Sequence, residues 1–252
     1  MPPPPGDGES VVFDRIADSY DETRGGMERG RQVAAVVAAW LPADPVLEVG
    51  VGTGLIAAGL AELGRPPVGV DLSLPMLAGA RKRIPGRLAV GDARRLPVGT
   101  GTVAGVCLVH VLHLVGDIPT TLAEVERVLR PGGAMVTTAF PGPVTGDVPA
   151  ELDRLHDRVG GRRRNVDVPL VTRLATAAGF TPSGRADGPE VGTAPGLAAD
   201  LVEARSISWM WDVDDELWAR EAPAAVARLR ALPDQDRPRQ APGSAYLTFT
   251  HL

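Results

Sequence analysis

The sequence predicts a doubly wound α/β fold, in which helices cover both faces of a mostly parallel sheet. Three observations support this class. Short apolar runs alternate with stretches of helical periodicity between Pro45 and Phe140. A glycine cluster separates the first apolar run from the helix that follows it. Acidic residues end several runs, at the edge where open α/β sheets bind ligands.

A leader and an amphipathic helix are expected before the first strand. Residues 1–10 include four successive prolines and are expected to form a disordered leader. From Arg29 to Leu41, apolar residues recur at helical spacing and define one face of an amphipathic helix that ends before Pro42. We therefore expect order from about residue 11, with residues 11–41 as an N-terminal cover.

The central part supplies most of the sheet. The run from Val103 to Val109 is uniformly apolar, which is typical of a central parallel strand buried on both faces. Ser73 is a suitable cap for the helix that follows the second strand, and Pro75 lies in its first turn. We expect strands at 45–49, 68–70, 88–90, 103–109 and 134–140, and helices at 55–63, 75–83 and 120–129.

The composition of the chain changes after Phe140 and becomes more polar, with several prolines and glycines. Two late strands around helical stretches predict an antiparallel addition to the sheet edge and a helical lid. The lid would consist of insertions at about 141–169 and 196–232 in one domain spanning 11–252. We expect helices near 150–159, 170–178, 196–211 and 214–232, and strands at 182–191 and 245–251.

Composition limits the possible partners. The 252 residues carry a formal charge of −5 with a pI of about 5.4, so no broad basic surface predicts nucleic-acid binding. The chain has no apolar stretch of membrane-spanning length, and its N-terminus lacks the features of a signal peptide. The single cysteine, Cys107, lies in an apolar run and reads as a small buried side chain. We expect a cytoplasmic monomer or homodimer with no membrane partner.

The glycine cluster after the first strand is the most informative segment. Gly52 to Ala57 satisfies the dinucleotide pattern G-x-G-x-x-A, and Asp71 follows about 20 residues later, where it could bind a ribose. Glu48 distinguishes between two ligands, because its carboxylate would repel a pyrophosphate and attract a sulfonium or an amino group. The sequence thus favours S-adenosylmethionine over a nicotinamide dinucleotide.

Four linked motifs between Phe13 and Phe140 resemble those of class I S-adenosylmethionine-dependent methyltransferases, in particular the small-molecule branch with the type 11 domain. The motifs are Glu48 to Gly54, Val70 to Ser73 with Met76-Leu77, Gly91-Asp92-Ala93 with Leu96-Pro97, and Arg127 to Gly133. This resemblance implies a Rossmann-like methyltransferase fold with seven strands, the last of them antiparallel. It also implies that S-adenosylmethionine binds along the ends of the first four strands.

The resemblance also implies roles for single residues. Asp71 would hold the ribose hydroxyls, Leu72 and Met76 would flank the adenine, Asp92 would accept from its amino group and Ala93 would offer a backbone N–H. Further cofactor contacts are expected from Tyr20, Arg24, Glu48, Gly50, Gly52, Gly54 and His110. For Tyr20 and Arg24 a plain alternative stays open, in which the tyrosine is a core residue and the arginine forms a surface ion pair.

The acceptor side is less defined. His113 follows the central fourth strand and is the candidate catalytic residue that contacts the acceptor and takes its proton, although a histidine bonded to backbone is the commoner case. No metal site is expected, because no carboxylate stands at a supporting spacing. Trp209, Met210, Trp211 and Trp218 either line an acceptor pocket or pack the core of the lid.

The expected function is transfer of a methyl group from S-adenosylmethionine to a small-molecule acceptor, with a secondary metabolite as one candidate. In-line displacement at a sulfonium needs positioning and desolvation rather than a catalytic triad. Two alternatives remain open: an NAD(P)-dependent oxidoreductase and a non-catalytic S-adenosylmethionine-binding regulator.

Overall fold

The computed structural model describes residues 13–14, 17, 20–23, 25–42, 45–140, 142–160, 166–188, 191–211 and 213–251. The chain divides into two compact units. The first unit comprises residues 1–140, 166–188 and 244–252, and the second comprises 141–165 and 189–243. The expected leader at 1–10 lies outside the described residues, and so do Arg24 and 162–164.

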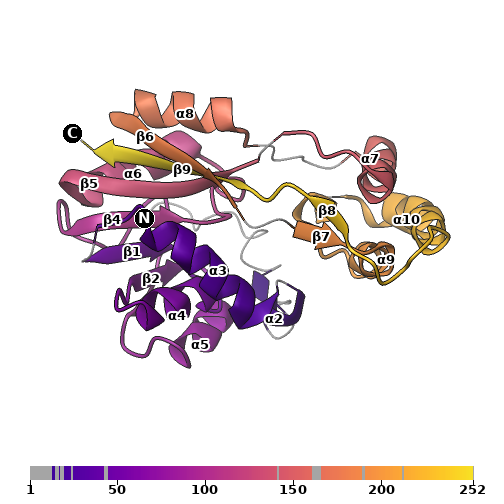
Figure 1. Cartoon of the computed structure of the whole chain (residues 1–252), viewed down its shortest axis with the longest axis horizontal. Helices are drawn as coiled ribbons and strands as arrows, with labels where there is room; N and C mark the ends of the chain where they lie inside the picture. Colours follow the sequence, from indigo (N-terminus) through magenta and orange to yellow (C-terminus); the bar gives the residue numbers. More distant parts are fainter. Residues whose placement is uncertain are drawn as a thin grey trace. The chain divides into compact units, whose positions relative to one another are not determined.

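The first unit contains a seven-stranded sheet in the order β3-β2-β1-β4-β5-β9-β6 (Figure 1). The five strands from β3 to β5 in this order are parallel, whereas β9 runs antiparallel to both of its neighbours, β5 and β6. This confirms the expected mostly parallel sheet with an antiparallel last strand. The strands are β1 (Val46–Val49), β2 (Val68–Asp71), β3 (Leu88–Val90), β4 (Val103–Leu108), β5 (Leu129–Ala139), β6 (Phe180–Asp187) and β9 (Ala245–His251).

Helices cover both faces of this sheet, as Figure 1 shows for α6 and α8 on one side and α3 and α4 on the other. Val125 of α6 and Val171 of α8 are fully buried in one core cluster, while Val37 of α3 and Leu60 of α4 belong to a second cluster. The doubly wound class is therefore confirmed. The helices are α2 (Tyr20–Thr23), α3 (Gly26–Ala38), α4 (Leu55–Glu62), α5 (Leu74–Arg81), α6 (Ile118–Val128) and α8 (Val168–Ala177).

Side-chain caps explain where several helices begin. The Ser73 hydroxyl accepts a hydrogen bond from the Met76 N–H at 3.2 Å, as expected for the first turn of α5. Asp117 and Asp167 accept in the same way from Thr120 and Leu170 at the starts of α6 and α8. Each cap satisfies a backbone N–H that lacks a partner within its own helix.

Two strand boundaries differ from expectation. β5 begins at Leu129, not at residue 134, because Leu129 already pairs with Val103 before a register irregularity around Pro131-Gly132-Gly133. β6 ends at Asp187, because residues 191–193 leave the large sheet and pair with another strand. Short-range periodicity does not predict either boundary, because both depend on strand partners that lie far along the chain.

The described part of the second unit consists of helices and a two-stranded antiparallel sheet, β7-β8 (Figure 1). Its elements are α7 (Asp147–Val159), β7 (Val191–Thr193), α9 (Pro195–Glu203), the 3-10 helix η1 (Ser208–Met210), α10 (Asp215–Arg230) and β8 (Arg239–Ala241). Leu155, Ala198, Met210, Trp218 and Leu229 are buried in its own core. The two expected insertions fall mostly within this unit, and their function as a lid stays a prediction.

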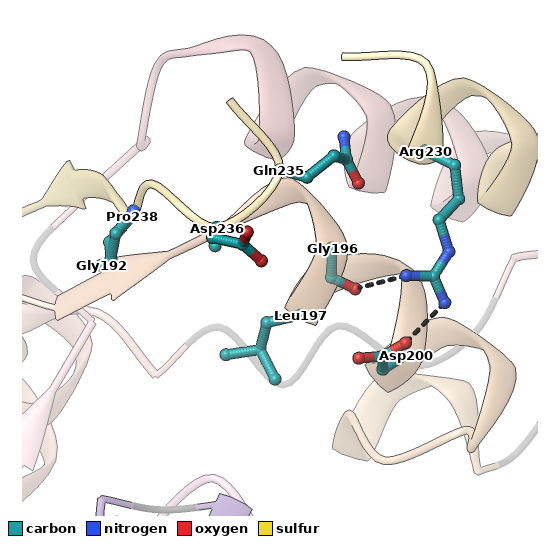
Figure 2. Close-up of a pocket in the computed structure, with 9 residues that line it drawn as sticks. Gly192, Gly196, Leu197, Asp200, Arg230, Gln235, Asp236 and Pro238 are labelled. Carbon is teal, nitrogen blue, oxygen red and sulfur yellow. Dashed lines mark hydrogen bonds and ion pairs between the residues drawn. The ribbon is translucent and has the colours of Figure 1, made fainter. Parts of the chain in front are cut away.

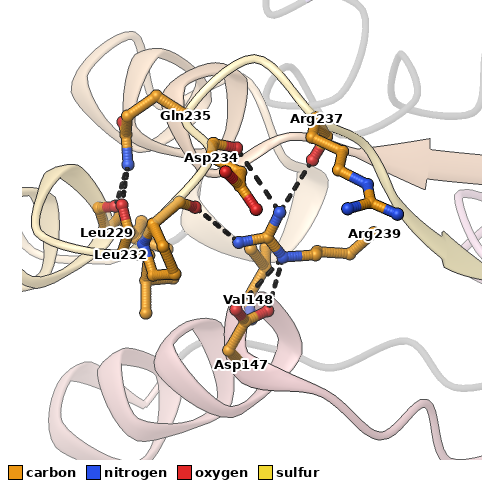
Figure 3. Close-up of polar contacts among 9 residues, drawn as sticks. Asp147, Val148, Leu229, Leu232, Asp234, Gln235, Arg237 and Arg239 are labelled. Carbon is orange, nitrogen blue, oxygen red and sulfur yellow. Dashed lines mark hydrogen bonds and ion pairs between the residues drawn. The ribbon is translucent and has the colours of Figure 1, made fainter.

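Arg239 connects the end of the second unit to its first helix (Figure 3). Its Nε donates to both carboxylate oxygens of Asp147, at 3.2 and 3.1 Å, and its other nitrogens donate to the carbonyls of Pro233 and Arg237 at 2.6 and 2.9 Å. Gln235 adds two bonds, to the carbonyls of Leu229 and Leu232. The turn after α10 is therefore held by hydrogen bonds from the side chains of Gln235 and Arg239.

Within the described residues, no helix combines the length and the apolar character needed to cross a membrane.

Candidate functional site

The glycine turn between β1 and α4 has the conformation that its sequence requires. Gly50, Gly52 and Gly54 have φ angles of 71°, 55° and 83°, in the left-handed region that glycine adopts without penalty. A Cβ on Gly50 would also lie 2.4 Å from Cγ2 of Val111, in the turn after β4. The turn after β1 thus needs glycine both for its backbone angles and for its close contact with the turn after β4.

Asp71, at the end of β2, is tied to this turn. Its Oδ2 accepts a hydrogen bond from the Gly52 N–H at 2.8 Å, and its Oδ1 accepts from the Ser73 N–H at 2.9 Å. Burial raises the pKa of the Asp71 carboxyl, and the backbone donors only partly oppose this shift. The two turns and the carboxylate form one hydrogen-bonded unit at the carboxyl edge of the sheet.

Glu48, in β1, is the most unusual group of the site. Its residue is 2% exposed, and its Oε2 has no hydrogen-bond partner among the described residues. Its neighbours across the sheet are Gly69 on β2 and Cys107 on β4, and neither is a strong donor. Burial, together with the charge of Asp71, raises the pKa of Glu48 to about 8.

Asp92, after β3, is occupied by a neighbour in its own loop. The Arg94 side chain donates to both Asp92 oxygens at 2.7–3.1 Å, and the Arg94 backbone N–H donates to Oδ1 at 2.8 Å. Burial opposes ionisation of Asp92, but the Arg94 hydrogen bonds and charge outweigh it and lower the pKa of this carboxyl. Asp92 is therefore an ionised acceptor with a fixed orientation.

The N-terminal cover is anchored to the glycine turn through Asp21 of α2. The Thr53 hydroxyl donates to Asp21 Oδ1 at 2.5 Å, and Arg83 donates to Asp21 Oδ2 at 2.5 Å. Arg83 also donates to the Thr53 carbonyl at 2.7 Å. No local pattern predicts these partners, because Thr53 and Arg83 lie 32 and 62 positions from Asp21.

A second anchor lies near the first. Asp14 Oδ1 accepts from the Ser73 hydroxyl at 2.6 Å, so the residue that caps α5 also holds the beginning of the described chain. The Tyr20 ring lies edge-on to Phe13, with centroids 6.4 Å apart. The cover therefore contacts the turns after both β1 and β2, as a segment that closes over a ligand at these turns would do.

The other expected site residues belong to the same unit. Met76 and Ala93 are buried, whereas Leu72 is 37% exposed beside the β2 end. His110 has a φ of 57°, and its N–H donates to the Thr138 hydroxyl at 2.8 Å. His113 is half-buried in the loop after β4. All expected cofactor residues except Arg24 are thus described. Glu48 and Asp71 lie in β1 and at the end of β2, Met76 lies in α5, and the others lie in the turns after β1 to β4 or in the cover.

The second unit has a hollow of its own, of about 560 Å³, at the start of α9 (Figure 2). It is polar at its wall, where Arg230 pairs with Asp200 at 2.5 Å and donates to the Gly196 carbonyl at 3.4 Å. None of the expected site residues line it. Trp218 and Met210 are buried in the core of this unit and Trp209 packs against that core, as in the plainer of the two alternatives for these residues.

In the part of the chain that the structure describes, no three His, Cys, Asp or Glu side chains are grouped so that they could hold a metal ion.

The fold and the turns together define the class I methyltransferase architecture, in which glycine and acidic residues follow the first strands of a seven-stranded sheet. A family model described as a methyltransferase domain matches residues 47–137. These residues, from β1 into β5, are therefore similar to the methyltransferase domain of this family, in agreement with the resemblance seen in the motifs.

Sequence relatives agree with this assignment. A demethylmenaquinone methyltransferase from Mycolicibacterium gilvum is 36% identical over 141 residues, covering 54% of this chain and 61% of that protein. The chain thus spans less than two thirds of the length of this curated relative.

Solved structures extend the likeness in fold to nearly the whole chain. The [4+2]-cyclase SpnF matches with a TM-score of 0.64 at 18% identity, over 96% of this chain and 94% of its own. A Haemonchus contortus phosphoethanolamine N-methyltransferase 2 in complex with S-adenosyl-L-methionine matches with a TM-score of 0.59 at 15% identity, over 100% of this chain and 61% of its own. Because a cyclase and a methyltransferase both share the fold, the fold alone does not fix the reaction.

Proposed function

We propose that this chain transfers a methyl group from S-adenosylmethionine to a small-molecule acceptor. The observation that carries the proposal is the buried Glu48 carboxyl, with an unpartnered oxygen, next to a glycine turn that Asp71 holds. A carboxyl that a neighbouring cation can ionise, beside the Asp71 carboxylate, suits a ligand that carries positive charge and a ribose. It also supports the choice of S-adenosylmethionine over NAD(P).

The residues of the site fit such a cofactor. Asp71 accepts from two backbone donors and retains lone pairs for ribose hydroxyls. Asp92, held ionised by Arg94, is a suitable acceptor for an adenine amino group. Leu72 and Met76 would flank the ring, and Ala93 would offer its N–H. Bound there, the cofactor would supply a methyl group on a sulfonium, which is a good leaving group.

We further propose that the cover and the loop after β4 complete the site. Tyr20 and Arg24 would approach the carboxylate of the methionyl end, where an arginine can bind with two hydrogen bonds. The turn at His110 would border the cofactor, and His113 would contact the acceptor and, for a hydroxyl or amine, take its proton. We expect this function in a monomer or homodimer in the cytoplasm.

The acceptor is the least constrained part of the proposal. The similarity to a demethylmenaquinone methyltransferase makes demethylmenaquinone the first acceptor to test, and a secondary metabolite remains the wider candidate. A regulator that binds the cofactor without reacting is the competing function, because the fold also serves proteins with other activities.

Calorimetry with S-adenosylmethionine, S-adenosylhomocysteine and NADH tests the cofactor. We expect the two adenosyl sulfur compounds to bind and NADH to give no heat. Binding of NADH alone would contradict the proposal. Transfer of labelled methyl from S-adenosylmethionine to demethylmenaquinone or other acceptors then tests the reaction, and binding without transfer to any acceptor would favour the regulator.

His113→Ala tests the acceptor side. If His113 takes a proton, turnover should fall by about 100- to 10,000-fold while S-adenosylmethionine affinity stays nearly unchanged, and the pH–rate profile should lose its acidic limb. The matched control is His156→Ala, in α7 of the second unit. It should keep the wild-type turnover and the wild-type affinity for S-adenosylmethionine. Unaltered kinetics in His113→Ala would return His113 to the class of structural histidines.

A further inference from the structure

We infer that Glu48 exchanges a proton for the positive charge of the bound cofactor, so that binding of S-adenosylmethionine releases a proton from the protein. The inference rests on the proposed function and adds how the affinity of the site is regulated. It concerns the charge state of one side chain, which can be measured without turnover.

The geometry around Glu48 disfavours a charge on its carboxyl when the protein is alone. Its carboxyl is buried, its Oε2 lacks a partner among the described residues, and no described cation forms an ion pair with it. An isolated carboxylate in an apolar interior is very unfavourable, so the side chain holds a proton instead. In agreement, the pKa of Glu48 is raised to about 8.

The groups around Glu48 reinforce this state. Asp71, from β2, adds a negative charge, and the pKa of the Cys107 thiol on β4 is raised by burial and by Glu48, which keeps this thiol neutral. Val46 lies on the same face of β1 as Glu48, because side chains alternate along a strand, and it packs under α3 and α4.

The charged groups of the two helices have contacts of their own. Arg31 of α3 pairs with Glu62 of α4 at 2.7 Å, Glu28 accepts a hydrogen bond from Gln32, and the charge of Arg29 acts on Tyr246. Among the described groups, the charge that acts on the pKa of Glu48 is that of Asp71, which is negative.

A cationic ligand reverses this balance. A sulfonium or ammonium beside the carboxyl favours the ionised form, so the O–H bond of Glu48 breaks, its electron pair stays on the carboxylate oxygen and the proton leaves to buffer. The charges balance, because one cation enters the site as one proton departs. Below about pH 8, the affinity should then rise with pH by up to about tenfold per unit, and above it the rise should stop.

Calorimetry in two buffers of different ionisation enthalpy counts the protons. S-adenosylmethionine is titrated into the whole protein at about pH 6.5 and about pH 9.5, with Glu48→Gln as the matched variant, because glutamine resembles the neutral form and cannot ionise. Protonation of the ligand's own amino group is common to both proteins and cancels. We expect the wild type to release about one proton more than the variant at the lower pH, and an equal number at the higher pH.

Infrared difference spectroscopy gives a second readout that does not require the variant to bind. The wild type alone should show the carbonyl band of a protonated carboxyl, absent in Glu48→Gln, and saturating S-adenosylmethionine should remove it. Equal proton counts, or a band that persists on binding, would overturn the inference and leave the proposed function intact. Failure of the wild type to bind S-adenosylmethionine would overturn both.

Discussion

At the scale of residues, the two buried carboxyl groups on β1 and β2 are stabilised in opposite ways. Asp71 accepts hydrogen bonds from the N–H groups of Gly52 and Ser73, whereas Glu48 Oε2 has no partner among the described residues. A hydrogen-bonded carboxylate contributes to the order of the backbone around it. A carboxyl without donors is neutral at low pH and becomes unfavourable when the pH rises.

Glu48 should therefore make the stability of the protein depend on pH. Its folded-state pKa of about 8 lies above the ordinary 4.5, so its contribution is fully present below pH 4.5 and is lost as the pH rises through 8. The slope is at most about 1.4 kcal/mol per pH unit. In urea unfolding, the free energy of unfolding of Glu48→Gln should rise relative to that of the wild type as the pH increases from 4.5 to about 8. If the free energy of unfolding depends on pH in the same way in both proteins, the raised pKa of Glu48 does not contribute to the pH dependence of stability.

Asp71→Ala should cost both stability and cofactor affinity. Loss of its carboxylate leaves the N–H groups of Gly52 and Ser73 without their acceptor, which should lower the free energy of unfolding by about 1 to 3 kcal/mol. Binding of S-adenosylmethionine should weaken by a similar amount, as calorimetry can measure. Asp167→Ala, which removes the cap of α8, should affect stability alone. A folded Asp71→Ala variant with unchanged affinity would remove Asp71 from the site.

Local sequence patterns identified the candidate site residues but not their hydrogen-bond partners. Glu48, the three glycines and Asp71 belong to one continuous motif or end a clear strand, so local patterns could identify them. Arg94 beside Asp92 and Arg83 beside Asp21 could not be foreseen, because many arginines in the chain have equal access to carboxylates in sequence terms. Only the folded turns select which of these pairs form.

At the scale of elements, the turns at the carboxyl edge depend on each other. The turn after β1 contacts the turn after β4 through Gly50 and Val111, and it is bonded to the end of β2 through Gly52 and Asp71. The α2 segment is joined to the same turn through Thr53. A substitution that displaces one of these turns should therefore also displace the turns that it contacts.

Gly50→Ala tests this dependence. The new Cβ would meet Val111 at 2.4 Å in a backbone with a φ of 71°, so we expect a loss of about 2 to 5 kcal/mol in the free energy of unfolding. Gly64→Ala is the matched control, because Gly64 also has a positive φ but no atom within 4 Å of the new Cβ. It should cost only about 1 to 2 kcal/mol. Adding Val111→Ala should restore part of the loss, and equal costs for the two glycines would exclude the contact.

Asp21→Asn tests the anchor of the cover. The change weakens the ion pair with Arg83 and the bond from Thr53, so α2 should open more often while the sheet stays intact. Hydrogen exchange at Tyr20–Thr23 should become faster, with no change in β4. Glu22→Gln, at the exposed neighbour, is the control. If both variants exchange alike, the anchor has no effect on the cover.

Most elements could be predicted from periodicity, because their apolar faces are continuous along the chain. Periodicity does not predict elements that depend on a strand partner far along the chain. Leu129 belongs to β5 because it pairs with Val103, and Val191 pairs with Ala241, fifty positions later. The short strands β7 and β8 carry no alternation of their own. Their formation depends on the second unit and not on their local sequence.

At the scale of the whole molecule, the core of the second unit shares no residue with the core clusters of the first. Phe249 of β9 is buried in the first unit, and Leu229 of α10 is buried in the second. Each unit contains segments that are distant in sequence, since the second is built from two stretches that interrupt the first. Separate cores are expected to respond separately to a cavity.

A pair of truncations of core side chains tests this separation. Phe249→Ala should cost about 3 to 5 kcal/mol and Leu229→Ala about 2 to 5 kcal/mol, each within its own unit. Hydrogen exchange should rise in β4 and β5 for the first variant and in α9 and α10 for the second. A uniform rise across both units in either variant would show that they unfold as one.

The position of β9 has a consequence for synthesis on the ribosome. β9 comes after every other described element, yet it lies between β5 and β6, and β6 has no other strand partner among the described residues. During translation β5 and β6 emerge before β9, and α9 and α10 are made between β6 and β9. Until residues 245–251 leave the exit tunnel, the nascent chain presents the open edge of β5, which pairs with β4 on its other side, and the unpaired strand β6. A chaperone must shield these edges, or a neighbouring nascent chain could bind them.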